Sequence, residues 1–318
     1  MASSIMTSTM EGYGSSVRAF LKWCEQNNIP TPYRFPTHTG VLLCFYRANL
    51  DQFRASTQRN RHAAIRLWHE LHGFELAVSE FALARLSRAG TLLQPEPLPS
   101  RRPVRLDDLQ VIRNGLEIHN DRAHAAIWAC VSFAFFSLAR IGEVTADLSA
   151  PRDPTARALR YHWSLRPPDG IIAATVTLRL PVDKAQGPTG SDLIASSQAA
   201  SAPQICPVHA VHHHLLVNAA VPADAGPFAY IDCNGHPREL TGSFCTDTAN
   251  AILAAANRPP IKGHCLRIGG TTFYMSAGIP ETDIRRHGRW KTDVMLTYIR
   301  RMYVSAGRTF ANVDPTFG

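Results

Sequence analysis

Apolar residues in the first 90 positions recur every three or four residues, which is the spacing of an amphipathic helix. The spacing predicts helices over about 13–28, after Pro36, over about 55–73, and over about 78–89 with an end at Gly90. The apolar positions that carry these predictions are Val17, Phe20, Leu21, Cys24, Val41, Leu42, Phe45, Tyr46, Ile65, Trp68 and Leu71. The pattern therefore predicts a compact, all-helical module.

Two stretches that flank this module lack the pattern. Residues 1–10 are rich in Ser, Thr and Met and are predicted to be disordered. Residues 94–103 contain four prolines and two arginines, a composition typical of an exposed, semi-rigid linker. We therefore expect a helical domain at 11–93, a linker at 94–103 and a second domain at 104–318.

The second domain mixes helical patterns with a short alternating stretch. Helices are predicted from Leu106, over 124–139, from Pro207 and over 240–256. Residues 175–180 alternate and are β-branched, and together with 192–195 they predict a β-hairpin that carries Lys184 at its bend. The predicted fold class is mainly α with a small antiparallel sheet, an all-helical N-terminal domain being followed by an α+β domain.

The charge of the chain favours a polyanionic partner. The net charge is +8, the pI is about 9.3, and 29 of the 33 basic residues are Arg. A planar guanidinium can bind two phosphate oxygens at once. Codon usage would produce the same bias, and a merely basic protein fits the net charge equally well.

Several classes of protein are disfavoured. The seven cysteines are scattered without a CxxC pair, which indicates reduced thiols and an intracellular protein. The most apolar run, 125–139, has 15 residues and is too short to span a bilayer, so it predicts a buried helix. Neither a P-loop nor a GxGxxG motif occurs, so we expect no nucleotide cofactor.

Four histidines lie within six positions, at His209, His212, His213 and His214. No Asp, Glu or Cys completes a plausible metal-ligand set, and adjacent side chains on a helix point in different directions. We interpret the group as a polar helix face and keep a His-based metal hydrolase as an alternative.

A basic stripe is predicted on the third helix of the first domain. Arg59, His62, Arg66 and His69 follow one another at spacings of 3, 4 and 3, which places them on one face. This stripe is a candidate DNA-facing surface, and a solvated polar face is the alternative interpretation.

Candidate chemistry is concentrated in residues 262–300. His264 and Arg267 are three residues apart and share one helix face. Upstream, Arg140 follows an apolar helix, and an unpaired buried charge there would cost several kcal/mol, so we expect Glu143 to hold its guanidinium. Further candidate DNA contacts are Arg285, Arg286 and Lys291.

These residue types suit phosphodiester transfer without a metal ion. The attacking hydroxyl must lose a proton, the leaving oxygen must gain one, and the transition state carries extra negative charge. Two guanidiniums, a His and a Lys meet these needs, and a Tyr can form a phosphotyrosine that preserves the bond energy for rejoining. The candidate catalytic residues are Arg140, Lys184, His264, Arg267, Trp290 and Tyr298.

The same residues, in this order, resemble the motifs of the tyrosine recombinases, the phage-integrase and Cre-type family of DNA breaking-rejoining enzymes. SLARIGEV resembles the first Arg box, LPVDK the Lys position, HCLRIGGTTF the His-x-x-Arg box and GRWKTDVMLTYIR the Tyr box. The helical module resembles the core-binding domain of the family, which clasps DNA. The resemblance covers nearly the whole chain, and its boxes extend over about 160 residues.

The resemblance implies a role for each residue. Arg140 and Arg267 would clamp the scissile phosphate. Tyr298 would attack it, leaving a 3′-phosphotyrosine and a free 5′-hydroxyl. Lys184 would protonate the leaving oxygen, and His264 would assist proton transfer at the tyrosine.

The chain departs from the family pattern at the second His, where some members have Trp. Arg289 lies nine residues before Tyr298 and Trp290 lies eight before it. Counting by the spacing of the family's Gly-His pattern before the Tyr selects Arg289. The local sequence GRW, which is similar to a GGW-like variant of that pattern, selects Trp290, with one residue deleted between it and Tyr298. We predict that Trp290 donates its indole N–H to the phosphate and that Arg289 supports the site. Tyr303 is a rival nucleophile.

The resemblance also implies an assembly: a homotetramer on two double-stranded DNA sites that exchanges strands through a Holliday junction, without metal or nucleotide. The sequence around the Tyr box looks closest to eukaryotic mobile-element members, so a nuclear location is expected. Two alternatives are a DNA-binding remnant of a mobile element that no longer cuts, and a type IB topoisomerase. The short chain and the helical module favour a recombinase.

Overall fold

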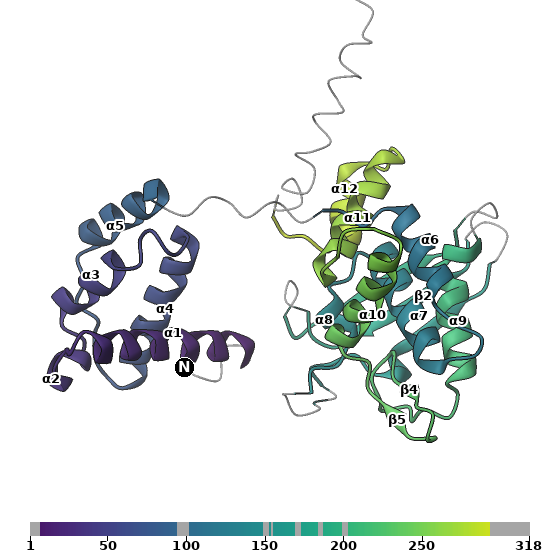
Figure 1. The fold of residues 1–318 in the computed structure, drawn as a ribbon, viewed down its shortest axis with the longest axis horizontal. Helices are drawn as coiled ribbons and strands as arrows, with labels where there is room; N and C mark the ends of the chain where they lie inside the picture. The colour runs from purple at the N-terminus through teal and green to yellow at the C-terminus, as the bar shows by residue number, and fades with distance from the viewer. Residues whose placement is uncertain are drawn as a thin grey trace, which may run out of the picture. The chain divides into compact units, whose positions relative to one another are not determined.

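The computed structural model describes residues 7–93, 102–148, 153, 155–168, 173–183, 187–198 and 203–292 (Figure 1). The chain divides into two compact units, 1–100 and 101–318, and each is described by itself. Most of the predicted linker, 94–103, lies outside the described residues.

The described part of the first unit is all-helical, as the apolar spacing predicts. Its helices are α1 (Thr7–Gln26), α2 (Thr31–Arg34), α3 (Thr39–Arg47), α4 (Ala55–Leu71) and α5 (Glu80–Leu93). The buried cluster at its centre consists of predicted apolar positions: Phe20, Cys24, Leu42, Phe45, Tyr46 and Ile65.

Two helix ends in this unit differ from the prediction. α1 begins at Thr7, so residues 7–10, which were predicted to be disordered, are helical. α5 continues through Gly90 to Leu93. Gly90 is buried, and a Cβ there would lie 3.3 Å from the Leu50 side chain, so this glycine permits close packing rather than ending the helix.

The second unit is α+β, so the predicted fold class is confirmed. Its helices are α6 (Leu106–Gly115), α7 (Arg122–Phe136), α8 (Ile141–Val144), α9 (Pro207–Val217), α10 (Gly242–Ala255), α11 (Gly263–Ser276) and α12 (Glu281–His287), with 3-10 turns η2 (Arg160–His162) and η3 (Pro203–Ile205). Its strands are β1 (Trp163–Arg166), β2 (Thr175–Leu180), β3 (Ser191–Ser196), β4 (Tyr230–Ile231) and β5 (Pro237–Arg238). Within the described residues, no helix combines the length and apolar character needed to cross a membrane.

α7 forms the centre of the second unit. Every residue from Ala125 to Phe136 is buried, and α9, α10 and α11 pack against the helix. The helix ends at Phe136, three residues earlier than predicted, because Leu138 adopts a left-handed φ of 54°. The chain turns there, so Arg140 is the N-cap residue of α8 and does not belong to α7.

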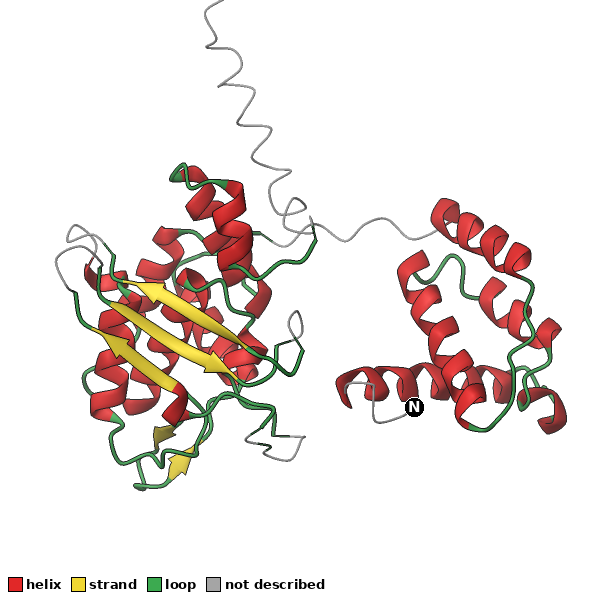
Figure 2. Cartoon of the chain, turned by 180° about the vertical axis from the view of Figure 1, so that it is seen from behind, coloured by secondary structure: helices red, strands yellow, loops and turns green. Residues whose placement is uncertain are grey.

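The predicted hairpin is the pair β2–β3 of a three-stranded antiparallel sheet (Figure 2). Alternate residues of these strands, such as Val176, Leu178 and Leu193, are buried on the face that packs on α7 and α9. β1 was not predicted, because its four residues are too few for an alternating pattern to stand out, and only Trp163 is even partly buried.

Two glycines let α11 lie directly against its neighbours. A Cβ added to Gly270 would overlap the carbonyl oxygen of Phe135 in α7, and one added to Gly269 would overlap that of Val104. Because backbone atoms cannot move aside, we expect Gly270→Ala to lower the free energy of unfolding by about 3 kcal/mol. Urea unfolding measures this change.

The matched control is Gly142→Ala in α8, where nothing lies within 4 Å of the added Cβ. It should change the free energy of unfolding by less than about 0.5 kcal/mol. Equal stability of Gly270→Ala and the wild type would contradict the close approach of α11 to α7.

Candidate active site

Arg267 is fully buried at the meeting point of three segments. Its terminal nitrogens donate to the carbonyl oxygens of Leu138 and Gly288, the second at 2.5 Å. The guanidinium carbon lies 4.1 Å from the centre of the Trp290 ring, a cation–π contact worth about 2 kcal/mol when desolvated. His264 is half-buried one turn earlier on α11. Arg267 thus lies where α7 and α12 end.

Arg140 and Glu143 make the contact that the sequence predicts. Nη1 of Arg140 donates to Oε1 of Glu143 at 2.6 Å, and the backbone N–H of Arg140 donates to Oε2 at 2.9 Å. The Arg140 side chain is 33% exposed. Its guanidinium is therefore oriented by a carboxylate and remains open to an anion from solvent.

Arg289 connects this pair to the β-hairpin. Its Nη2 donates to Oε2 of Glu143 at 2.7 Å, and its Nη1 donates to Oδ2 of Asp183 at 2.5 Å and to Oγ of Ser191 at 3.0 Å. The side chains of Arg289 and Asp183 are 6% and 0% exposed. Sequence reasoning missed Asp183 and Ser191, although an acidic residue directly before Lys184 was a usable signal.

The charge state of Glu143 follows from these contacts. Burial by itself would raise the pKa of Glu143, but the charges of Arg289 and Arg140 and the backbone hydrogen bond from Arg140 outweigh it. The pKa of this carboxyl therefore lies below its ordinary value. Glu143 is an anion at neutral pH and holds two guanidiniums together.

Arg289 and Trp290 are adjacent but reach different partners. Arg289 has a left-handed φ of 60°, so the chain reverses at this residue. Gly288 provides room for the Trp290 ring, which a Cβ at that position would overlap. The indole consequently stacks on Arg267, whereas Arg289 binds Glu143. The catalytic role of Trp290 stays a prediction.

Lys184, Tyr298 and the rival Tyr303 lie outside the described residues. The residues next to the bend are described: Asp183 and Gly187 exchange backbone hydrogen bonds of 3.0 and 2.6 Å. The hairpin that carries Lys184 is therefore closed at its base. The roles of Lys184 and Tyr298 stay predictions.

The predicted DNA contacts at the end of α12 differ in their surroundings. Arg285 donates to the carbonyl oxygen of Lys291 at 2.9 Å and so stabilises the turn after the helix. The Arg286 side chain is 83% exposed, with Asp283 at 3.5 Å. Lys291 is also exposed. Arg286 and Lys291 are thus open to a partner, while Arg285 supports the local backbone.

The predicted stripe on α4 is wrong at His69. This residue is fully buried, and its ring nitrogens meet the backbone N–H of Thr37 and the carbonyl oxygen of Ile65, each at 2.8 Å. It fastens the segment before α3 to α4. Arg59 and Arg66 are exposed and remain candidate DNA contacts.

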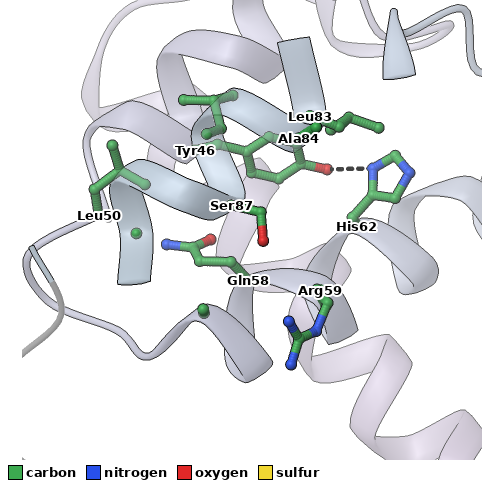
Figure 3. A pocket seen from close by; sticks show the side chains of 11 residues that line it. Tyr46, Leu50, Gln58, Arg59, His62, Leu83, Ala84 and Ser87 are labelled. Carbon is green, nitrogen blue, oxygen red and sulfur yellow. Dashed lines mark hydrogen bonds between the residues drawn. The ribbon is translucent and has the colours of Figure 1, made fainter. Parts of the chain in front are cut away.

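His62 faces a pocket of about 390 Å³ between α3, α4 and α5 (Figure 3). Its Nδ1 lies 3.0 Å from the Tyr46 hydroxyl. Burial, with a smaller contribution from the charge of Arg66, lowers the pKa of His62, so the ring is neutral at pH 7. A neutral ring bonded to Tyr46 supports a structural role more than a phosphate contact. The pocket is lined by Tyr46, Leu50, Ala55, Gln58, Arg59, His62, Leu83, Ala84, Leu86, Ser87 and Gly90.

The histidines of α9 are not a uniform polar face. His209 and His212 are exposed, but His214 is fully buried. Burial, reinforced by the charge of Arg160, lowers the pKa of His214 to about 3, so it is a neutral core residue. The polar-face interpretation is wrong for His214. In the described ranges, no three His, Cys, Asp or Glu side chains group as metal ligands.

Comparison with known proteins identifies the fold. No protein-family model and no curated protein matches the sequence. A lambda integrase dimer bound to a COC′ core site has a TM-score of 0.54 and 14% identity, covering 92% of this chain and 89% of that chain. The chain has the integrase fold. XerH site-specific recombinase bound to palindromic difH substrate has a TM-score of 0.54 and 11% identity, covering 91% of this chain and 75% of that chain.

A third similar structure is the Tn1549 transposon integrase in complex with transposon right end DNA. Its TM-score is 0.53 at 11% identity, covering 96% of this chain and 99% of that chain. At identities this low, the comparisons show that the chain has the integrase fold and nothing beyond the fold. The resemblance that the sequence motifs predict is therefore confirmed at the level of the fold.

The lowered pKa of Glu143 predicts a pH-dependent stability. A carboxyl whose pKa is depressed by folding stabilises the protein above its ordinary pKa, near 4.3, and this stabilisation is lost as the pH falls through the folded-state value. Glu143→Gln leaves a buried guanidinium short of one charge partner, so we expect a loss of about 3 kcal/mol at pH 7.

The difference in unfolding free energy between wild type and Glu143→Gln should shrink as the pH falls below about 4. Urea unfolding at a series of pH values measures it. If this difference in unfolding free energy stays constant with pH, Glu143 is not ionised in the folded protein.

Proposed function

We propose that the protein is a site-specific DNA recombinase or integrase that cleaves and rejoins DNA through a 3′-phosphotyrosine. One observation carries the proposal: Arg267 donates to the carbonyl oxygen of Leu138, two residues before Arg140, so the segments that carry the two arginines are in contact. Two guanidiniums, together with a His one turn from Arg267 on α11, suit a phosphodiester whose negative charge grows in the transition state.

In the proposed reaction, the Tyr298 oxygen attacks the scissile phosphorus. The tyrosine O–P bond forms as the bond from phosphorus to the 5′-oxygen breaks. His264 takes the proton of the tyrosine, and Lys184 gives a proton to the 5′-oxygen. Because one phosphodiester replaces another, the reverse attack by a 5′-hydroxyl rejoins DNA without an external energy source.

Trp290 has a place in this reaction that follows from its contact with Arg267. The indole stacks on the buried guanidinium, so we expect Trp290 to shift before a phosphate reaches Arg267. After the shift, the indole N–H can donate to the phosphate, as the family pattern implies for this position. Arg140, which is partly exposed, would then make the first contact with DNA.

The proposed partner is double-stranded DNA, bound by a homotetramer on two sites. Support comes from solved neighbours with the same fold: one is named as a lambda integrase tetramer bound to a Holliday junction, with a TM-score of 0.55 and 13% identity. The eukaryotic mobile-element origin and the nuclear location rest on the sequence around the Tyr box alone and stay predictions.

The central prediction is a covalent DNA adduct. We would incubate the protein with a library of nicked duplexes of random sequence, in which the short 5′-hydroxyl fragment diffuses away and cleavage cannot reverse. Wild-type protein should be trapped on DNA, Tyr298→Phe should form no adduct, and Tyr303→Phe should match the wild type. Mass spectrometry of the digested adduct identifies the tyrosine.

The same experiment separates the alternatives. Sequence-specific DNA binding with no adduct indicates a remnant that no longer cuts. Adducts at all sequences, with relaxation of supercoiled DNA, indicate a type IB topoisomerase. Cleavage that stops in chelator and survives Tyr298→Phe indicates a metal hydrolase.

The exposed arginines of α4 allow a second prediction, on DNA binding. If Arg59 neutralises a phosphate, Arg59→Gln should reduce the slope of log K against log salt by about 0.9. Fluorescence anisotropy with duplex DNA at several salt concentrations measures this slope. Arg88→Gln, an exposed arginine on α5, is the matched control and should leave the slope unchanged. Equal slopes for both variants would remove Arg59 from the DNA-binding surface.

A further inference from the structure

We propose that Arg289 is a positioning residue that sets the place of the Lys184 hairpin relative to the Arg140–Glu143 pair. This inference rests on the proposed function. Arg289 bonds to Glu143 in α8 with Nη2, at 2.7 Å, and to Asp183, three residues after β2, with Nη1, at 2.5 Å. One side chain therefore bridges two segments that carry different parts of the reaction.

The hairpin side of the bridge is built around Asp183. Its carboxylate is fully buried and receives hydrogen bonds from Arg289 and from the Ser191 hydroxyl on β3. Its backbone N–H and carbonyl bond to Gly187 across the bend. Lys184 follows Asp183 directly in the chain. Holding Asp183 by both its side chain and its backbone fixes the position of the residue that precedes Lys184.

The other side of the bridge ends at the candidate phosphate clamp. Oε1 of Glu143 accepts a hydrogen bond from the Arg140 guanidinium. Oε2 accepts from the Arg289 guanidinium and from the Arg140 backbone N–H. Two carboxylates and two guanidiniums thus alternate in the order Arg140, Glu143, Arg289, Asp183. The formal charges cancel, which offsets the cost of burying Glu143, Arg289 and Asp183.

The two ion pairs of Arg289 separate this role from direct phosphate binding. The Arg289 side chain is 6% exposed, and each of its terminal nitrogens already donates to a carboxylate. Arg140, by contrast, has a 33% exposed side chain, and among the described residues Glu143 is its carboxylate partner. Arg289 also adopts the left-handed backbone conformation, which residues other than glycine rarely adopt. The backbone at 289 therefore directs the guanidinium to the two carboxylates.

The test asks whether loss of Arg289 disables the proton donor. A DNA substrate with sulfur in place of the 5′-bridging oxygen has a leaving group that needs no proton. On ordinary DNA we expect Arg289→Met to slow single-turnover cleavage by about 100-fold, because the hairpin is misplaced. On the sulfur substrate its rate should return to within about 10-fold of the wild type, since proton donation is no longer needed.

Reference variants define the two patterns. Lys184→Ala should be rescued by sulfur and Arg140→Ala should not. Arg238→Gln removes an exposed arginine ion pair with Asp232 in the same unit and should cleave both substrates at the wild-type rate. If Arg289→Met does not fold by circular dichroism, Asp183→Asn removes the other half of the bridge with little change in shape and should show the same rescue.

Two results of the cleavage experiment would overturn the inference: cleavage of ordinary DNA at the wild-type rate by a folded Arg289→Met or Asp183→Asn protein, or a loss of cleavage rate that the sulfur substrate does not relieve. A fall of about 0.9 in the salt slope of DNA binding for Arg289→Met would also overturn it, because it indicates a phosphate contact. Failure of the wild type to cleave either substrate would instead contradict the proposed function.

Discussion

The burial of α7 is the constraint on which the second unit depends. A helix whose last twelve residues are all buried must be covered on every side, and α9, α10, α11 and the sheet supply that cover. Its cost is that the chain has to leave the core at the end of the helix. The left-handed residue Leu138 makes this exit, and the carbonyl oxygen left there accepts a hydrogen bond from Arg267. The end of a hydrophobic helix thereby becomes one wall of a polar site.

The polar site is held by charges that alternate in sign. Glu143 lies between Arg140 and Arg289, and Arg289 lies between Glu143 and Asp183. An isolated member of this set would be costly to bury, but each has an opposite neighbour within hydrogen-bond distance. The set connects α8, the β2–β3 hairpin and the turn after α12. A site made in this way exists only when all three segments are folded together.

Much of the architecture could be predicted from the sequence because periodicity is a local property. The helical positions of Phe20, Phe45 and Ile65 and the alternation of the 175–180 strand appear directly in the order of residues, and the structure places these residues in the cores. Local patterns failed where packing decided the outcome. α5 passes through Gly90, which is buried against Leu50, and His69 is buried although its spacing fits a polar stripe.

The sequence by itself determined the helical first unit, the hairpin, the pairing of Arg140 with Glu143 and the shared helix face of His264 and Arg267, because each depends on residues close in the chain. Only the tertiary structure decided that Arg267 is enclosed under Trp290, and that Arg289 turns away to join Glu143 with Asp183. These contacts join residues 23, 106 and 146 positions apart. No local pattern encodes them, since the partner of a buried charge is chosen by the fold that brings the segments together.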